Sequence, residues 1–123
     1  MSGITYPWPL KSLSPNARVH WSIKSKATKN MRRAAHLLTL EAGWRGVEWE
    51  GDILISVIFF PPDKRARDID NMFSSSKAIF DGLADALGVN DKRFVFNISA
   101  SNQIGGYVKV NISRPHVYNY KIM

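Results

Sequence analysis

Two carboxylates separated by one residue, Asp68 and Asp70, stand in a strongly basic segment of the chain. Arg67 directly precedes the pair, and Lys64 and Arg65 lie a few residues earlier. If the backbone is extended here, side chains at i and i+2 point to the same face. Carboxylate oxygens suit Mg²⁺, which is usually held by one or two carboxylates together with water and phosphate. Because a metal site among cations suits a polyanionic substrate, the pattern predicts metal-dependent cleavage of nucleic acid.

The same pair has a second, purely structural interpretation. Asp and Asn are favoured in turns and at helix N-termini, so the run Asp68-Ile69-Asp70-Asn71 could simply cap a helix. The basic residues just before it would, however, neutralise a phosphodiester. A helix beginning near Asn71 would also offer free backbone N–H groups to an anion. Both interpretations rest on the same residues, so other residues of the chain must distinguish between them.

Two further residues could complete such a site. Asp91 stands in a predicted turn, where an ordinary turn aspartate is the alternative. The helix expected before this turn carries the chain away from Asp70, so the strand geometry must bring Asp91 back. Lys77 follows Asp70 by seven residues, on nearly the same side of a helix but about 10 Å along its axis. Lys77 could contact a phosphate, or it could pair with Asp81 at i, i+4.

The positive charge of the chain is concentrated in its first third. The formal net charge is +7, the first acidic residue is Glu41, and from there on basic and acidic residues balance. A localised basic region is the usual footprint of contact with a phosphate backbone; a solvated helix face with a loose arm is the alternative. We expect a basic N-terminal arm at about residues 10–28. The predicted DNA-contacting residues are Lys11, Arg18, Lys24, Lys26, Lys29, Arg32, Arg33, Lys64, Arg65 and Arg67.

Composition narrows the class of protein. A length of 123 residues predicts a single domain over 1–123, and 45% hydrophobic with 22% charged residues is ordinary for a globular protein. There is no apolar stretch of membrane-spanning length and no leader-like N-terminus, so we expect a cytoplasmic protein without a membrane partner. The chain lacks cysteine, and its three histidines match no zinc spacing. We expect no organic cofactor.

Hydrophobic patterning predicts a small α/β (α+β) domain with a mixed sheet and two main helices, in the order β-α-β-α-β-β. Apolar, β-branched runs predict strands at 4–8, 53–60, 93–100 and 107–113. The last two are expected to form a hairpin through Gly105-Gly106. Loops are expected at 10–25 and 61–67, and an irregular tail from Pro115.

Capping residues place the two helices. The first is expected to start after Ser25 or Thr28 and stop at Gly43, and the second to run from Asp70 or Asn71 to about Leu87. Phe80 falls on the core stripe of the second helix, so core packing is favoured over a role as a wedge between base steps. The four tryptophans are likewise expected to pack or to seal a dimer rather than to stack on bases.

Taken in order, these residues resemble the RusA family of Holliday junction resolvases. The likeness runs through residues 6–9, 67–71 and 77–83 to Asp91 and Gly105-Gly106, and it covers most of the chain. There are two departures. The family commonly places its lysine three residues after the asparagine, whereas Lys77 follows Asn71 by six. In addition, Asn90-Asp91 stands where two aspartates are common.

The resemblance implies a homodimeric, Mg²⁺-dependent endonuclease, in which Mn²⁺ could substitute, that makes paired symmetric nicks across a four-way DNA junction. It implies Asp68, Asp70 and Asp91 as the essential metal-binding aspartates and Lys77 as the active-site lysine. Such a protein would be bacterial or phage-encoded and would serve DNA recombination and repair. Two alternatives stay open: a non-catalytic basic module that holds branched DNA, and a metal-dependent nuclease acting on flaps or RNA.

Overall fold

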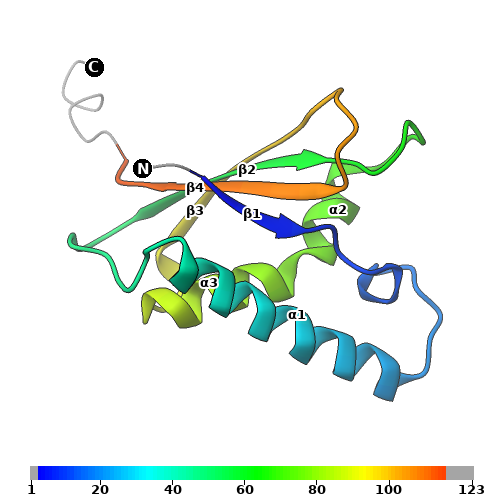
Figure 1. Cartoon of the computed structure of the whole chain (residues 1–123), viewed down its shortest axis with the longest axis horizontal. Coiled ribbons are helices and arrows are strands. Elements are labelled where there is room, and N and C mark those ends of the chain that lie inside the picture. Colours follow the sequence, from blue (N-terminus) through cyan, green and yellow to red (C-terminus); the bar gives the residue numbers. More distant parts are fainter. Residues whose placement is uncertain (1–2, 116–123) are drawn as a thin grey trace.

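A four-stranded mixed sheet with two long helices packed against one face makes up the fold (Figure 1). The computed structural model describes residues 3–115, so the tail predicted from Pro115 lies almost entirely outside it. The strands are β1 (Ile4–Pro7), β2 (Ile53–Phe60), β3 (Phe94–Ala100) and β4 (Tyr107–Ser113). The helices are α1 (Trp21–Glu41), α2 (Ile69–Ser75) and α3 (Lys77–Leu87), with short 3₁₀ turns η1 (Lys11–Leu13) and η2 (Asp91–Arg93). The α+β class and the mixed sheet predicted from the sequence are confirmed.

The strand order is β1-β4-β2-β3, with β2 parallel to β3 and antiparallel to β4. The predicted hairpin between β3 and β4 is therefore wrong, because both strands pair with β2, one on each side. The connecting segment passes over the end of β2, where the N–H groups of Gly105 and Gly106 donate to the carbonyls of Pro61 and Phe60. Gly106 has φ +80°, a conformation that favours glycine. The uncharged β2 thus takes a central place in the sheet.

Alternation along β2 sets the core. Ile53, Ile55, Val57 and Phe59 are almost fully buried on the helix-facing side, whereas the residues between them are half-buried. Each side chain of this size stabilises the fold by roughly 1.5–3 kcal/mol when fully buried. The helices contribute the other half of the core through residues such as Met31, Ala35, Ile79 and Leu83.

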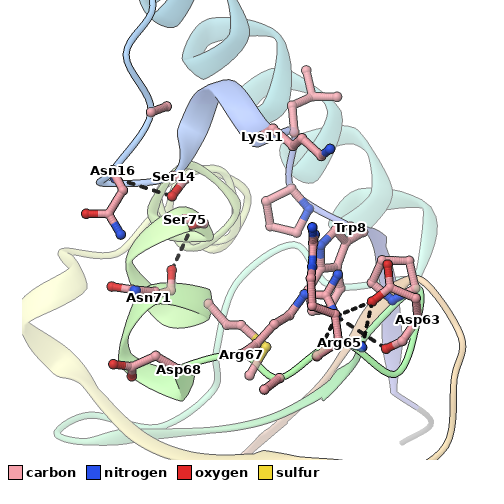
Figure 2. A pocket seen from close by; sticks show the side chains of 16 residues that line it. Trp8, Lys11, Ser14, Asn16, Asp63, Arg65, Arg67, Asp68, Asn71 and Ser75 are labelled. Atoms are coloured by element: carbon pink, nitrogen blue, oxygen red, sulfur yellow. Dashed lines mark hydrogen bonds and ion pairs between the residues drawn. The ribbon is translucent and has the colours of Figure 1, made fainter.

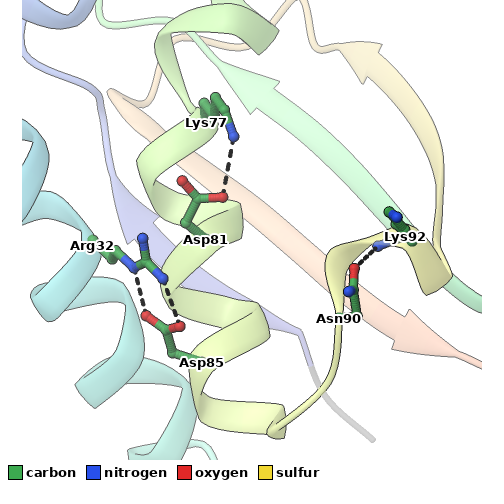
Figure 3. Close-up of polar contacts among 6 residues, drawn as sticks. All are labelled: Arg32, Lys77, Asp81, Asp85, Asn90 and Lys92. Atoms are coloured by element: carbon green, nitrogen blue, oxygen red, sulfur yellow. Dashed lines mark hydrogen bonds and ion pairs between the residues drawn. The ribbon is translucent and has the colours of Figure 1, made fainter.

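The contact between α1 and α3 depends on Gly82. A Cβ atom at this position would overlap the backbone carbonyl oxygen of Arg32, so only glycine allows the two helices to approach this closely. One turn further along α3, Asp85 accepts two hydrogen bonds from the Arg32 guanidinium, at 2.6 and 2.9 Å (Figure 3). The hydrogen bonds from Arg32 hold the pKa of the Asp85 carboxyl below its ordinary value.

The first long helix starts earlier than predicted. It begins at Trp21, where the Nδ1 atom of His20 accepts a hydrogen bond from the Ser22 backbone N–H at 3.2 Å. Histidine is not among the residues that are usual at an N-cap. The sequence therefore predicted a start after Ser25 or Thr28. The predicted basic arm at 10–28 is therefore shorter. Its residues from Trp21 onward belong to α1, and the part before Trp21 contains the 3₁₀ turn η1.

The predicted second helix is two helices that meet at Ser76. The hydroxyl of Ser76 donates a hydrogen bond to the backbone carbonyl of Met72 at 2.9 Å. The hydroxyl of Ser75 donates to the backbone carbonyl of Asn71 at 2.7 Å. Serine hydroxyls that bond back to preceding carbonyls compete with regular helix bonding, which fits a break at this point. In α3 the side chain of Phe80 is buried against Phe73 and Phe96, so its predicted place in the core is confirmed.

Candidate active site

An open pocket of about 670 Å³ lies between the segment that follows β1 and the connection from β2 to α2 (Figure 2). Asp68 and Asn71 stand on one side of it, across from Trp8 and Asp63. The residues lining it are Trp8, Pro9, Leu10, Lys11, Ser14, Asn16, Ala17, Pro62, Asp63, Arg65, Ala66, Arg67, Asp68, Asn71, Met72 and Ser75. Four predicted site residues therefore meet here: Lys11, Arg65, Arg67 and Asp68.

The acidic pair is held at the start of α2. Asp68 has an extended backbone and is the N-cap, whereas Asp70 already lies in the first helical turn. Oδ1 of Asp68 accepts a hydrogen bond from the backbone N–H of Asp70 at 2.8 Å. The two side chains are thus not related by strand alternation, because the helix starts between them. Asp68 is the cap rather than Asp70 or Asn71, and both aspartates are exposed.

Arg67 has an internal role in the loop. Its Nη1 donates to Oδ1 of Asp63 at 2.8 Å and to two backbone carbonyls of the same loop, and the guanidinium lies 5.7 Å from the centre of the Trp8 ring. Only 15% of the Arg67 side chain is exposed. The hydrogen bond from Arg67 is the main reason why the pKa of Asp63 is lowered. Arg67 therefore shapes the pocket wall, while the exposed Lys64 and Arg65 are free to face an anion.

Asp63 and Trp8 were not among the predicted site residues. The spacing of Asp63 and Arg67 at i, i+4 was a usable signal for their ion pair, although such pairs are usually considered only within helices. Trp8 falls in the N-terminal segment that resembles the RusA family, and it was expected, like the other tryptophans, to pack or to seal a dimer. No local pattern could show that its ring would meet Arg67, because β1 and the loop come together only through the sheet.

Lys77 lies outside the main pocket. Its Nζ is 3.3 Å from Oδ1 of Asp81, which is the i, i+4 pair considered as the alternative to a phosphate contact (Figure 3). The Lys77 side chain is 74% exposed. It lines a second pocket of about 320 Å³ together with Lys24, Thr28 and Ser74. Ser75 lines both pockets, so the two are neighbours on one surface.

Asp91 opens the η2 turn, where Asn90 accepts a hydrogen bond from the Lys92 N–H at 2.9 Å (Figure 3). The parallel register places Phe94 opposite Ile53, so this turn stands at the beginning of β2 and β3, whereas the loop leading to Asp68 leaves the end of β2. Within residues 3–115, no three His, Asp or Glu side chains are grouped closely enough to hold a metal ion together. The structure therefore brings Asp68 and Asp70 together without Asp91.

The chemistry of the two donors still fits Mg²⁺. Mg²⁺ keeps several waters and is often bound through one or two carboxylates plus the phosphates of a substrate, rather than by an all-protein cage. Asp68 uses one carboxylate oxygen as the helix cap and retains the other, and Asp70 is exposed beside it. Both lie at the N-terminal end of α2, and Asp68 shares its pocket with Lys11 and Arg65.

The remaining predicted DNA-contacting residues lie on the surface of the N-terminal third. Lys11, Arg18, Lys24, Lys26, Lys29 and Arg33 are exposed. Arg32 is also exposed, but its guanidinium is engaged by Asp85. In the described part of the chain, no helix is both long and apolar enough to cross a membrane.

The fold and pocket define a small α+β domain with an exposed acidic pair on a basic surface. No family model matches the sequence. The chain is 42% identical over 117 residues to an uncharacterized protein of Xylella fastidiosa, an alignment that covers 92% of this chain and 76% of that protein. At this identity and coverage the chain belongs to the same family as the Xylella protein.

Proposed function

We propose that the protein is a Mg²⁺-dependent endodeoxyribonuclease of the RusA type, which resolves four-way DNA junctions by paired nicks. The observation that carries the proposal is the exposed pair of Asp68 and Asp70 beside an open pocket with Lys11 and Arg65 on its walls. Two carboxylates suit a metal ion, and the cations around them suit the phosphates of the strand to be cut. The order of sequence segments shared with the RusA family supports the same class.

In this proposal each residue has a defined task. Asp68 and Asp70 would hold Mg²⁺. The family likeness implies Asp91 as a third carboxylate, but in this structure Asp91 lies at the opposite end of β2, so the two-carboxylate site carries the proposal. When bound, the ion supplies Lewis-acid chemistry that activates water and offsets charge on the phosphate. Hydrolysis forms a new bond from water oxygen to phosphorus and breaks the bond to the 3′ oxygen. Lys11 and Arg65 hold the backbone on the two sides of the pocket, where they fix position without reading bases.

Lys77 would add positive charge close to the reacting phosphate after leaving Asp81. Lys77 is exposed and the contact is a surface i, i+4 pair, so its separation costs little. Two copies of the chain related by a two-fold axis would place two identical sites on two equivalent strands of a junction. The homodimer therefore belongs to the proposal as the source of paired cuts.

The second candidate is a basic module that holds branched DNA without cutting it. Three observations favour it. Asp68 caps α2, Lys77 pairs with Asp81, and Asp91 lies in a separate turn. Under this alternative the aspartates serve the fold alone, and the exposed basic residues account for all DNA contact.

A junction-cleavage assay separates the two. The wild type and Asp70→Asn are compared on a four-way junction, a flap and a linear duplex at equal salt, with and without Mg²⁺. The nuclease proposal expects nicking of the junction that requires both Mg²⁺ and Asp70, with binding preserved in the variant. Asp52→Asn is the matched control, because Asp52 is an exposed aspartate just before β2. Junction binding without Mg²⁺-dependent nicking by the wild type would support the binding module instead.

A further inference from the structure

The indole of Trp21 is the most exposed large apolar side chain in the described residues, with 75% of its surface accessible. The tryptophans were expected to pack or to seal a dimer; Trp8, Trp44 and Trp49 pack against the core, whereas Trp21 does not. Its ring lies against the imidazole of His20, with centroids 5.6 Å apart and planes tilted by 34°. The imidazole is itself held by the hydroxyl of Ser22 at 2.7 Å. The indole is therefore presented to the outside beside a ring that is fixed by the helix cap.

Trp21 begins the helix α1, which also carries two residues of the second pocket. Positions 21, 24 and 28 share one side of α1, because residues at i, i+3 and i+7 are neighbours on a helix. Lys24 and Thr28 line that pocket, and Ser75 connects it with the larger pocket that contains Asp68. Lys24 thus lines a pocket that adjoins the one with Asp68, and Trp21 lies one helical turn before Lys24 on α1.

We propose that Trp21 is a stacking platform for an unpaired base of the bound DNA strand, whose adjacent phosphate lies against Lys24. The inference rests on the proposed binding of DNA and adds where an unpaired segment would be held. Aromatic side chains on a basic surface bind single strands in this way, because every base offers a face for stacking and every linkage carries a charge. Branched DNA offers such unpaired bases where its arms meet.

The charges around Trp21 favour nucleic acid over a protein partner. Arg18, Lys24 and Lys26 are close to it in sequence and exposed, and no acidic residue occurs before Glu41. The cores of protein interfaces are depleted in charged residues, especially lysine. Val19 and Ile23 are exposed near Trp21 as well, so the surface combines apolar side chains with cations. This combination is expected of a site for a negatively charged strand that also carries aromatic bases.

Binding is tested without metal, so that no strand is cut, on an oligothymidylate of about twelve nucleotides and on a duplex of the same length. Trp21→Ala is expected to weaken binding of the single strand by roughly tenfold to a hundredfold, the equivalent of a lost base stack. Trp21→Phe is expected to retain most of the affinity, and duplex binding should change little in either variant. Leu37→Ala is the matched control, because Leu37 is 54% exposed on the same helix.

Tryptophan fluorescence supplies a second readout. The single strand is expected to quench the wild type more strongly than Trp21→Phe, because only the former carries the exposed indole. Equal single-strand affinity in Trp21→Ala and the wild type would overturn the proposal. A variant that loses self-association in sedimentation while it keeps its affinity for the single strand would also overturn it, in favour of a protein interface.

The test of Trp21 is independent of the nuclease proposal. Asp70→Asn should show the same quenching as the wild type, because it changes the acidic pair and leaves Trp21 in place. A protein that shows the quenching but never nicks a junction would keep the stacking site and lose the proposed nuclease activity. Nicking without any contribution of Trp21 to binding would do the reverse.

Discussion

The backbone N–H of Asp70 donates a hydrogen bond to Oδ1 of Asp68 at 2.8 Å, so one member of the acidic pair caps the helix that carries the other. The structural and the catalytic interpretations of the sequence are therefore not exclusive. A cap uses one carboxylate oxygen, and the second remains available for a cation. The cap also fixes how the two carboxylates are placed, because Asp70 can move only with the first turn of α2.

Substitutions of Asp68 separate its two roles. Asn keeps an oxygen that can cap the helix, so Asp68→Asn is expected to unfold with nearly the free energy of the wild type while losing Mg²⁺-dependent nicking. Asp68→Ala loses the cap as well and should cost about 0.5–2 kcal/mol of stability. Denaturant unfolding and junction cleavage measure the two effects. Full nicking by Asp68→Asn would restrict Asp68 to a structural role.

Lys77 is tested together with its partner. Lys77 is exposed, Asp81 is half-buried, and the pair has the less favourable lysine-first order. Lys77→Ala and Asp81→Asn should therefore each change stability by less than about 0.5 kcal/mol. If Lys77 stabilises the reacting phosphate, Lys77→Ala lowers the nicking rate by roughly a hundredfold. Asp81→Asn, which frees the lysine, should keep that rate or raise it. Single-turnover cleavage checks both, and equal rates for Lys77→Ala and wild type would remove the lysine from the site.

Tyr6 makes the free energy of unfolding depend on pH in the alkaline range. Its hydroxyl is 2.7 Å from Oγ1 of Thr39, which in turn donates to the Ala35 carbonyl, and burial raises the pKa of Tyr6 from 10.0 to about 12. Because the folded pKa is the higher one, this contribution to stability is complete below pH 10.0 and is lost as the pH rises through about 12. Tyr6→Phe should lose about 1 kcal/mol at neutral pH.

The difference in unfolding free energy between wild type and Tyr6→Phe should therefore shrink across that alkaline range, measured by denaturant titration at several pH values. Tyr107→Phe is the control, since Tyr107 lies on β4 with part of its ring exposed and stacked on Phe60. A constant difference between Tyr6→Phe and wild type at all pH values would contradict the assigned cause.

Gly82 tests the contact between the long helices. Replacing a helical glycine by alanine normally stabilises a helix by about 1 kcal/mol. Here the added Cβ would meet the Arg32 carbonyl, the Ala35 Cβ and the His36 N–H of α1, so Gly82→Ala should instead cost about 1–3 kcal/mol. Thermal unfolding checks the sign. A stabilised variant would show that the two helices can separate without loss.

Local signals predicted several elements well. The uncharged, β-branched run of β2 indicated a buried strand, and its alternating burial follows from the two-residue period of a strand. The second helix was predicted to end at about Leu87, and α3 ends there, with Gly88 after it in the left-handed conformation with φ +64°. The start of α1 was missed because its cap is a histidine, and the break at Ser76 was missed because serines are tolerated inside helices.

The sequence by itself determined the elements that depend on near neighbours: the strands, the helix ends marked by glycine, the acidic pair and the excess of positive charge before Glu41. Tertiary structure alone decided that β2 separates β3 from β4, since strand pairing depends on which surfaces are buried together. It also decided that Arg67 lies against Trp8, that Lys77 lines a pocket together with Lys24, and that Asp91 lies at the other end of β2 from Asp68. Such relations join residues distant in sequence, and no local spacing can encode them.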